Sequence, residues 1–197
     1  MSRLVDEEAL IKGLINGCQQ SCKTLVEHYW NELNYLATRL LADESVAKDC
    51  VQEAFIKAIT KIESYKGLGT FKAWLHQIVV NEALTELRKK SNRKEESLEE
   101  LMLDFDKTGH YVESYQGQLV DIETLENSLE VKQQISQSID KLPDNFRVIL
   151  ILRDYEGYST KEVAEKMGMT EQNVKVRLHR ARLAMRNLIH DSLNIMG

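Results

Sequence analysis

The chain has 197 residues and a formal net charge of −5 at pH 7, which leaves room for one large domain or two small ones. One proline and nine glycines favour an all-helical protein, because strand-rich folds need more turn residues. The sequence starts without the apolar core of a signal peptide, and no apolar run approaches the roughly 18 residues of a membrane span. We therefore expect a cytoplasmic protein without membrane insertion.

The three cysteines, Cys18, Cys22 and Cys50, are odd in number and form no paired Cys-x-x-Cys. This pattern argues against a disulfide framework or a zinc site. Cys18, Cys22 and His28 would be the only candidate metal cluster, and reduced helical cysteines are the preferred interpretation. We expect no metal and no cofactor.

Apolar residues at helical spacing predict four helices in the first half of the chain. The first spans residues 6–16, the second residues 21–41, and the third runs from a break at residues 42–45 to about Ile62. The fourth spans residues 71–90 and follows an irregular loop with two glycines. These helices predict a small N-terminal bundle.

Residues 91–130 form a strongly acidic segment with eleven acids and only three bases. The rest of the chain is therefore positive overall, and the acidic total does not argue against a nucleic-acid partner. Scattered glycines and polar residues predict a flexible linker without a packed core of its own.

A second helical domain begins near Leu125. A lead-in helix carries Leu129, Ile135 and Ile139, and Pro143 is expected at the first position of the next helix, where its missing N–H costs nothing. Phe146 and Ile149 mark the buried side of that next helix.

The last part of this domain has the pattern of a helix-turn-helix. Ser159 and Glu162 form a capping box, Thr170 is placed to cap the following helix, and Gly168 suits the positive φ of a tight exit. The small or apolar residues Ala164, Val174 and Leu178 predict the inward face.

The outward face of the last helix carries groups suited to base edges and phosphates in a major groove. The alternative is an ordinary helical hairpin with a solvated basic face. The outward residues are Gln172, Asn173, Lys175, Arg177, Arg180 and Arg182.

Two sequence blocks together resemble a known family. DCVQEAFIKA at residues 49–58, followed by FKAWLHQIVVNEAL at residues 71–84, is similar to the second conserved region of bacterial RNA polymerase sigma factors of the extracytoplasmic-function (ECF) group. The segment 142–182 resembles their fourth region. The resemblance spans roughly residues 6–190 and implies an all-α protein of two small domains, residues 6–94 and 125–192, joined by the acidic linker 95–124.

The resemblance implies that the outward face of the third helix binds the clamp helices of the largest subunit of core RNA polymerase. Acidic and amide groups beside an aromatic residue suit a polar rim around a small apolar contact. A merely solvated helix face is the alternative. The implied contact residues are Asp49, Gln52, Glu53 and Phe55.

The glycine loop and the fourth helix resemble the unit that opens the minus-ten promoter element and holds an unpaired base. Trp74 is interpreted as a core residue rather than a stacking wedge. The implied base-holding residues are Tyr65, Lys66, Gly67, Gly69 and Asn81, and the implied phosphate contacts are Lys72, Arg88, Lys89, Arg93 and Lys94.

The family reads the minus-thirty-five element as duplex DNA with the last helix. The implied base-edge residues are Asn173, Lys175, His179 and Arg180, with Gln172 and Arg177 at the groove wall. His179 stands where a larger aromatic is expected. The linker resembles a connector that threads the RNA exit path, and family members are often held by an anti-sigma protein.

No nucleotide-binding or hydrolase motif is present, so we expect no catalysis by the chain itself. The sequence thus predicts a sigma factor that brings core polymerase to promoters and promotes strand opening. One alternative is a free-standing dimeric helix-turn-helix regulator, which would bind specific duplex without polymerase. Another is a helical adaptor, which would leave the basic recognition face unexplained.

Overall fold

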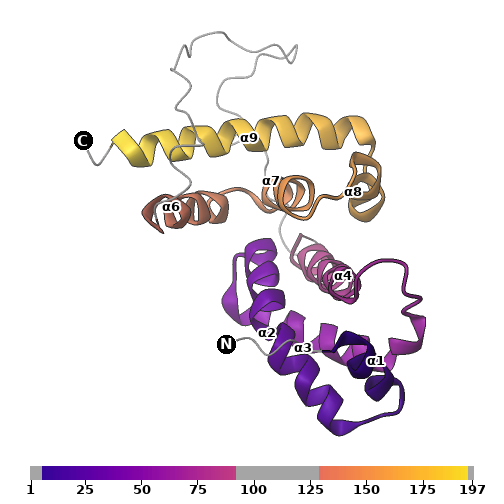
Figure 1. Ribbon diagram of the computed structural model, residues 1–197. Coiled ribbons are helices and arrows are strands. Elements are labelled where there is room, and N and C mark those ends of the chain that lie inside the picture. The colour runs from indigo at the N-terminus through magenta and orange to yellow at the C-terminus, as the bar shows by residue number, and fades with distance from the viewer. Residues whose placement is uncertain (1–5, 92–128, 195–197) are drawn as a thin grey trace.

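The computed structural model describes residues 6–91 and 129–194, which form helices and their connections. The N-terminal domain consists of α1 (Glu7–Ile15), α2 (Gln19–Leu41), α3 (Glu44–Thr60), the short 3₁₀ helix η1 (Ile62–Ser64) and α4 (Phe71–Ser91). The C-terminal domain consists of α6 (Leu129–Asp140), α7 (Asp144–Leu150), the π-helical turn η2 (Ile151–Tyr155), α8 (Thr160–Met167) and α9 (Glu171–Asn194). Figure 1 shows the two domains packed against each other. The linker prediction lies outside the described residues.

The expected helices are present, and local caps explain where they begin. The Asp6 carboxylate accepts hydrogen bonds from the backbone N–H groups of Glu8 and Ala9, and Asp43 does the same for Ser45 and Val46 at the start of α3. Pro143 lies one residue earlier than expected: it precedes α7 in an extended conformation (φ −54°, ψ 146°), and Asp144 is the first helical residue.

The core of the N-terminal domain forms around α2, which packs against both α3 and α4. Its buried side chains follow the predicted stripe, because Leu25, Tyr29, Leu33, Leu36 and Leu40 recur every three or four residues. Phe71, fully buried at the start of α4, closes this core through edge contacts with Tyr29 and Tyr65 and stacks on the partly buried Trp74. The core assignment of Trp74 is confirmed.

The core of the C-terminal domain lies between α7 and α9. Phe146, Ile149 and Leu150 of α7 are buried, and α9 contributes Val174 and Leu178. The register of the helix-turn-helix follows from this packing, since the buried residues of α9 fix which of its faces points outward.

The sequence predicted two domains on a linker and gave no sign that they contact each other. In the structure α7 lies against α2 and α8 lies against α4 (Figure 1). Arg147 is 2% exposed, and its Nε donates to the backbone oxygen of Leu40 at 3.3 Å while its Nη1 donates to that of Leu142 at 2.8 Å. A guanidinium buried at this junction with hydrogen bonds to both domains marks a specific contact.

Candidate functional site

The outer face of α3 carries three polar residues and one apolar residue, spaced so that they lie side by side. Asp49, Gln52 and Glu53 are exposed, as expected, and Ile56 is 54% exposed beside them. We call these four residues the docking face.

Phe55 does not belong to the docking face, which corrects the sequence expectation. It is 4% exposed, and its ring stacks on Trp30 with the centroids 6.3 Å apart. Ile56, one position further, turns outward and supplies the exposed apolar group of this surface. The helical period could have indicated this, because Phe55 follows the buried Ala54 and lies four residues after the buried Val51.

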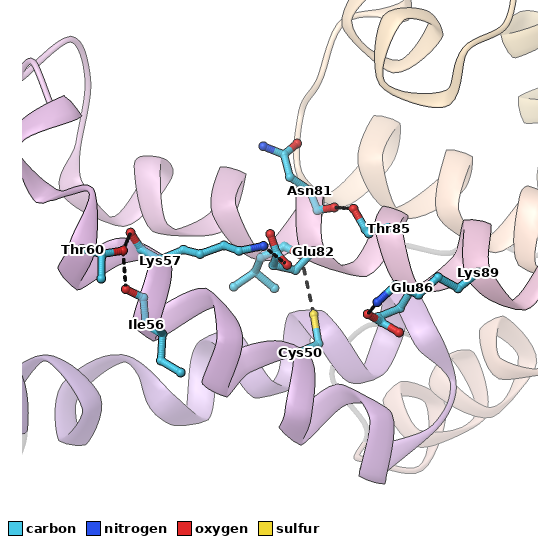
Figure 2. Close-up of polar contacts among 10 residues, drawn as sticks. Cys50, Ile56, Lys57, Thr60, Asn81, Glu82, Thr85, Glu86 and Lys89 are labelled. Atoms are coloured by element: carbon cyan, nitrogen blue, oxygen red, sulfur yellow. Dashed lines mark hydrogen bonds and ion pairs between the residues drawn. The ribbon is translucent and has the colours of Figure 1, made fainter.

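Helix α3 is fixed to α4 by polar contacts that lie behind the docking face (Figure 2). Lys57 Nζ donates to Glu82 Oε2 at 2.5 Å, and the Glu82 side chain is only 15% exposed. Cys50 is buried with its Sγ 3.9 Å from the backbone oxygen of Val79, and burial together with the charges of Glu82 and Glu86 raises the pKa of Cys50 to about 12. The docking face and the outer face of α4 therefore move as one body.

The loop between η1 and α4 is a well-defined turn with an exposed tip. Gly67 and Gly69 have φ values of 71° and 115°, which favour glycine. Tyr65 Oη donates to the backbone oxygen of Gly69 at 2.8 Å, and its ring packs against Phe71 and Trp74. Lys66 is exposed, and Leu68, which the sequence analysis did not single out, is 93% exposed at the tip. Tyr65 therefore anchors the loop and is only partly accessible.

Asn81 lies on the outer face of α4, where its side chain points away from α3 (Figure 2). The residue is exposed, but its amide oxygen accepts a hydrogen bond from Lys166 Nζ of α8 at 2.9 Å. Two turns further along α4, Arg88 Nη2 donates to the backbone oxygen of Lys166 at 2.5 Å. The predicted base-contacting asparagine is therefore bound by the chain's own C-terminal domain.

The predicted phosphate-binding cations of α4 are exposed and most have acidic partners. Lys72 pairs with Glu32, and Lys89 pairs with Glu86 at 2.6 Å. Exposed ion pairs contribute little stability, so such cations exchange partners readily. Arg93 and Lys94 lie outside the described residues.

The helix-turn-helix begins and turns as the sequence predicted. Ser159 Oγ accepts from the Glu162 N–H at 3.2 Å, and Glu162 Oε2 accepts from the Ser159 N–H at 2.7 Å, which completes the capping box. Gly168 ends α8 with φ 66°, and Thr170 Oγ1 caps α9 by accepting from the Asn173 N–H at 3.2 Å.

The outward face of α9 is open and polar, on the side of the C-terminal domain away from α4 (Figure 1). Gln172, Asn173, Lys175 and His179 are exposed, and Arg177 and Arg180 are half-buried. Val176 is 39% exposed between them, which the sequence analysis missed.

Arg182 is part of the domain's own structure, although the sequence analysis placed it on the outward face. Its Nε and Nη2 donate to the two carboxylate oxygens of Asp154 at 2.9 and 2.6 Å. The hydrogen bond to Asp154 raises the pKa of Arg182. This bidentate pair ties α9 to η2 and leaves the recognition residues to the first half of the helix.

Two further features concern the described residues as a set. Within residues 6–91 and 129–194, no group of three or more His, Cys, Asp or Glu side chains is placed to hold a metal ion. In the same ranges, no helix combines the length and apolar character needed to cross a membrane.

Comparison with known proteins gives matches to both domains. The family model of Sigma-70 region 2 matches residues 25–93, and that of Sigma-70 region 4 matches residues 132–185. The chain is 31% identical over 194 residues to the ECF RNA polymerase sigma-E factor of Haemophilus influenzae, covering 96% of this chain and 98% of that protein. It is also 31% identical over 185 residues to the ECF RNA polymerase sigma factor SigW of Bacillus subtilis, and this match covers 92% of this chain and 95% of that protein.

Among solved structures, the fold is similar to that of the sigma factor RpoE from Bartonella quintana, determined in complex with the anti-sigma factor NepR. The TM-score is 0.53 at 26% sequence identity, and the match covers 85% of this chain and 96% of that one.

Proposed function

Since the chain belongs to the ECF sigma factors of bacterial RNA polymerase, we propose that three of its surfaces divide the work of transcription initiation. It is a sigma factor, which binds core polymerase, directs it to specific promoters and promotes strand opening. Residues 6–94 serve polymerase and minus-ten binding, residues 125–192 serve minus-thirty-five binding, and residues 95–124 connect them. We propose that it acts in the cytoplasm.

The docking face is proposed to bind the clamp helices of the polymerase largest subunit. Asp49, Gln52 and Glu53 offer exposed acceptors and an amide, and the exposed Ile56 gives a small apolar centre. An apolar centre with a polar rim is the usual composition of a protein interface. Because Lys57 and Glu82 hold α3 against α4, docking also fixes the position of the minus-ten surface.

The minus-ten surface is proposed to consist of the loop 65–69 and the outer face of α4. Gly67 and Gly69 bring the backbone near an unpaired base, and Asn81 offers an amide to its edge. Unstacking a base costs a few kcal/mol, and stacking and hydrogen bonds of roughly 1–3 kcal/mol each offset that cost. Strand opening then needs no ATP. The proposed phosphate contacts are the cations Lys72, Arg88, Lys89, Arg93 and Lys94.

The first half of α9 is proposed to enter the major groove of the minus-thirty-five element. Asn173, Lys175 and Arg180 are suited to base edges, since amides pair with adenine and cations with guanine. His179 is proposed as a further base-edge residue, with Gln172 and Arg177 at the groove wall. Val176 adds an apolar group on the same face, which suits the methyl group of a thymine.

An anti-sigma protein is proposed as a further partner. The Bartonella RpoE structure, which contains such a protein, aligns with 85% of this chain. A partner of this kind would compete with core polymerase for the chain.

The observation that carries this proposal is the exposed docking face on the same rigid helix pair as Asn81. The test is transcription in vitro from genomic DNA by core polymerase plus the purified chain, with the transcript ends sequenced. We expect discrete start sites that share two upstream sequence blocks.

Two outcomes would contradict the proposal. If the chain bound a specific duplex without polymerase, and core polymerase gained no start sites from it, the free-standing regulator would be the better interpretation. If it bound neither polymerase nor DNA, the adaptor interpretation would stand.

A further inference from the structure

A cleft of about 680 Å³ lies where the two domains meet. Its walls come from α2 and α4 on one side and from η2, the turn after it and α8 on the other. Five charged residues face this cleft besides His76: Glu32 and Arg39 of α2, Lys72 of α4, Glu156 of the turn, and Glu162 of α8.

His76 joins the two walls of the cleft. Its Nδ1 lies 2.8 Å from Glu156 Oε2 in the C-terminal domain, and its Nε2 lies 3.0 Å from Glu32 Oε1 in the N-terminal domain. The His76 and Glu156 side chains are only 14% and 17% exposed. We call Glu32, His76 and Glu156 the clasp.

A charged imidazole satisfies both contacts of the clasp when both glutamates are ionised. Ionised carboxylates only accept hydrogen bonds, and a neutral imidazole has a single N–H, so it can donate to one carboxylate but not to both. An imidazolium donates to both. Burial lowers the pKa of His76, but the hydrogen bonds and charges of Glu156 and Glu32 outweigh it, so the pKa is raised overall.

The direction of this pKa shift determines how pH affects the contact between the domains. We call the arrangement in which the two domains are in contact, as in the structure, the closed arrangement. Glu156 belongs to the C-terminal domain, so its hydrogen bond and charge raise the pKa of His76 only while the domains are in contact, and proton binding therefore favours closure. The stabilisation of the closed arrangement by protonated His76 is fully present below the ordinary histidine pKa of about 6.5 and is lost as the pH rises through the raised pKa. Without the proton, the imidazole can donate to only one of the two carboxylates, and Glu32 keeps its ion pair with Lys72.

Three tyrosines complete the titratable groups of the cleft: Tyr35, Tyr155 and Tyr158. Burial, with the charges of Glu156 and Glu162, raises the pKa of Tyr158 to about 12. Carboxyl, phenol, lysine and arginine groups ordinarily titrate outside the range of about pH 6 to 9, so histidine is the one side chain type here that ordinarily changes charge near neutrality.

The closed arrangement also carries an opposing cost. Arg39 is 8% exposed, its guanidinium lies 4.6 Å from the centroid of the Tyr155 ring, and its Nη1 donates to Tyr35 Oη at 2.7 Å. Its Nε and Nη2 are buried without a hydrogen-bond partner in the described part of the chain. Buried unsatisfied donors destabilise the state that buries them, which lowers the net stability of the closed arrangement.

Closure and promoter binding exclude each other. The minus-ten and minus-thirty-five elements lie about 25 base pairs apart, or about 85 Å along B-DNA. In the closed arrangement Asn81 instead lies within a hydrogen bond of Lys166, which belongs to the helix-turn-helix itself. A chain as long as residues 92–128 can reach roughly 120 Å when fully extended, which is enough for the separation.

We propose that the clasp is a proton-dependent latch: protonated His76 holds the free chain closed, and loss of the proton releases the C-terminal domain to reach its own promoter element. This inference rests on the proposed function for its consequence, but the latch itself is a property of the free protein.

The test is small-angle X-ray scattering of the full chain, without polymerase or DNA, from about pH 6 to about pH 9. We expect a compact protein at the low end and a larger radius of gyration at the high end. The open-to-closed ratio should rise by at most tenfold per pH unit, because one proton is involved.

Matched variants make the test specific to the clasp. His76→Gln should enlarge the protein at low pH and remove the pH response, whereas His28→Gln, at an exposed histidine outside the cleft, should behave as the wild type. Glu156→Gln should also open the chain at low pH, and Glu165→Gln, an exposed acid on α8, should not. Helical content by circular dichroism confirms that each variant is folded.

A pH-independent radius of gyration in the wild type, or a wild-type response in folded His76→Gln, would overturn the latch. Transcription by the wild type would leave the proposed function standing in that case. The converse result, a pH-dependent size with no transcription at any pH, would support the latch and overturn the proposed function.

Discussion

The docking face on α3 and the proposed minus-ten surface on α4 belong to the same helix pair. In the closed arrangement the docking face is exposed, whereas the minus-ten surface is in contact with the C-terminal domain. Asp49, Gln52, Glu53 and Ile56 are exposed, whereas the amide oxygen of Asn81 is bound by Lys166. With the roles proposed above, the chain would meet polymerase before its strand-opening surface is available. The contacts between the domains would then determine the order in which the chain binds polymerase and promoter DNA.

The largest effect is expected from Phe55→Ala, which tests where the docking face ends. Removing a buried aromatic side chain costs about 3–5 kcal/mol, so the free energy of unfolding of the N-terminal domain in urea should fall by that amount. Ile56→Ala, one residue further, should change it by no more than about 0.5 kcal/mol and instead weaken polymerase binding. Equal losses of stability in both variants would contradict the assignment of Ile56 to the surface.

Charge reversal by Glu53→Lys should weaken binding to core polymerase on the order of a hundredfold, because like-charge juxtaposition in an interface costs several kcal/mol. Fluorescence anisotropy of labelled chain against core polymerase measures this. Glu27→Lys, an exposed acid on α2, is the matched control and should bind normally. Comparable weakening in both variants would indicate a general charge effect and no specific docking face.

Asn173→Ala sharpens the comparison with the open recognition helix. A bidentate amide contact to adenine is worth about 1–3 kcal/mol of discrimination, so polymerase carrying this variant should lose its preference at one base pair of the minus-thirty-five element. Affinities for a set of single-base promoter variants measure this. A uniform loss on every sequence would assign Asn173 to a phosphate.

The smallest effect is expected from Lys166→Met, which keeps most of the aliphatic part of the side chain and removes the ammonium group that binds Asn81. The loss of one such hydrogen bond, about 1 kcal/mol, should favour the separated form by roughly fivefold. Hydrogen exchange at the outer face of α4 measures it, with Lys161→Met on exposed α8 surface as control. Unchanged exchange would show that this contact does not contribute to closure.

The sequence predicted best what is set by short stretches of chain. The capping box of Ser159 and Glu162 and the positive φ of Gly168 involve residues within one or two turns, so their types suffice to predict the helix-turn-helix. The buried stripe of α2 is equally local. The error at Phe55 arose because the family resemblance placed it on a surface, although the helical period places it beside the buried Val51 and Ala54, and its ring stacks on Trp30.

The contacts between the domains could not be predicted in this way. His76 and Glu156 are eighty residues apart in the sequence, with the whole linker between them. Nothing in the periodicity of either helix indicates that they meet. The same holds for Arg147, whose burial depends on a carbonyl of α2. Such partners follow from tertiary structure alone.

The central claim is that the two domains bind each other in the free chain and separate to bind two distant promoter elements. Pulsed electron paramagnetic resonance tests it by measuring the distance between Lys61→Cys, at the residue that follows α3, and Lys161→Cys on α8, both spin-labelled in a chain whose own cysteines are replaced. The account predicts a short distance in the free chain and one longer by several tens of ångströms in an active polymerase–promoter complex. An unchanged distance in a complex that transcribes would contradict it.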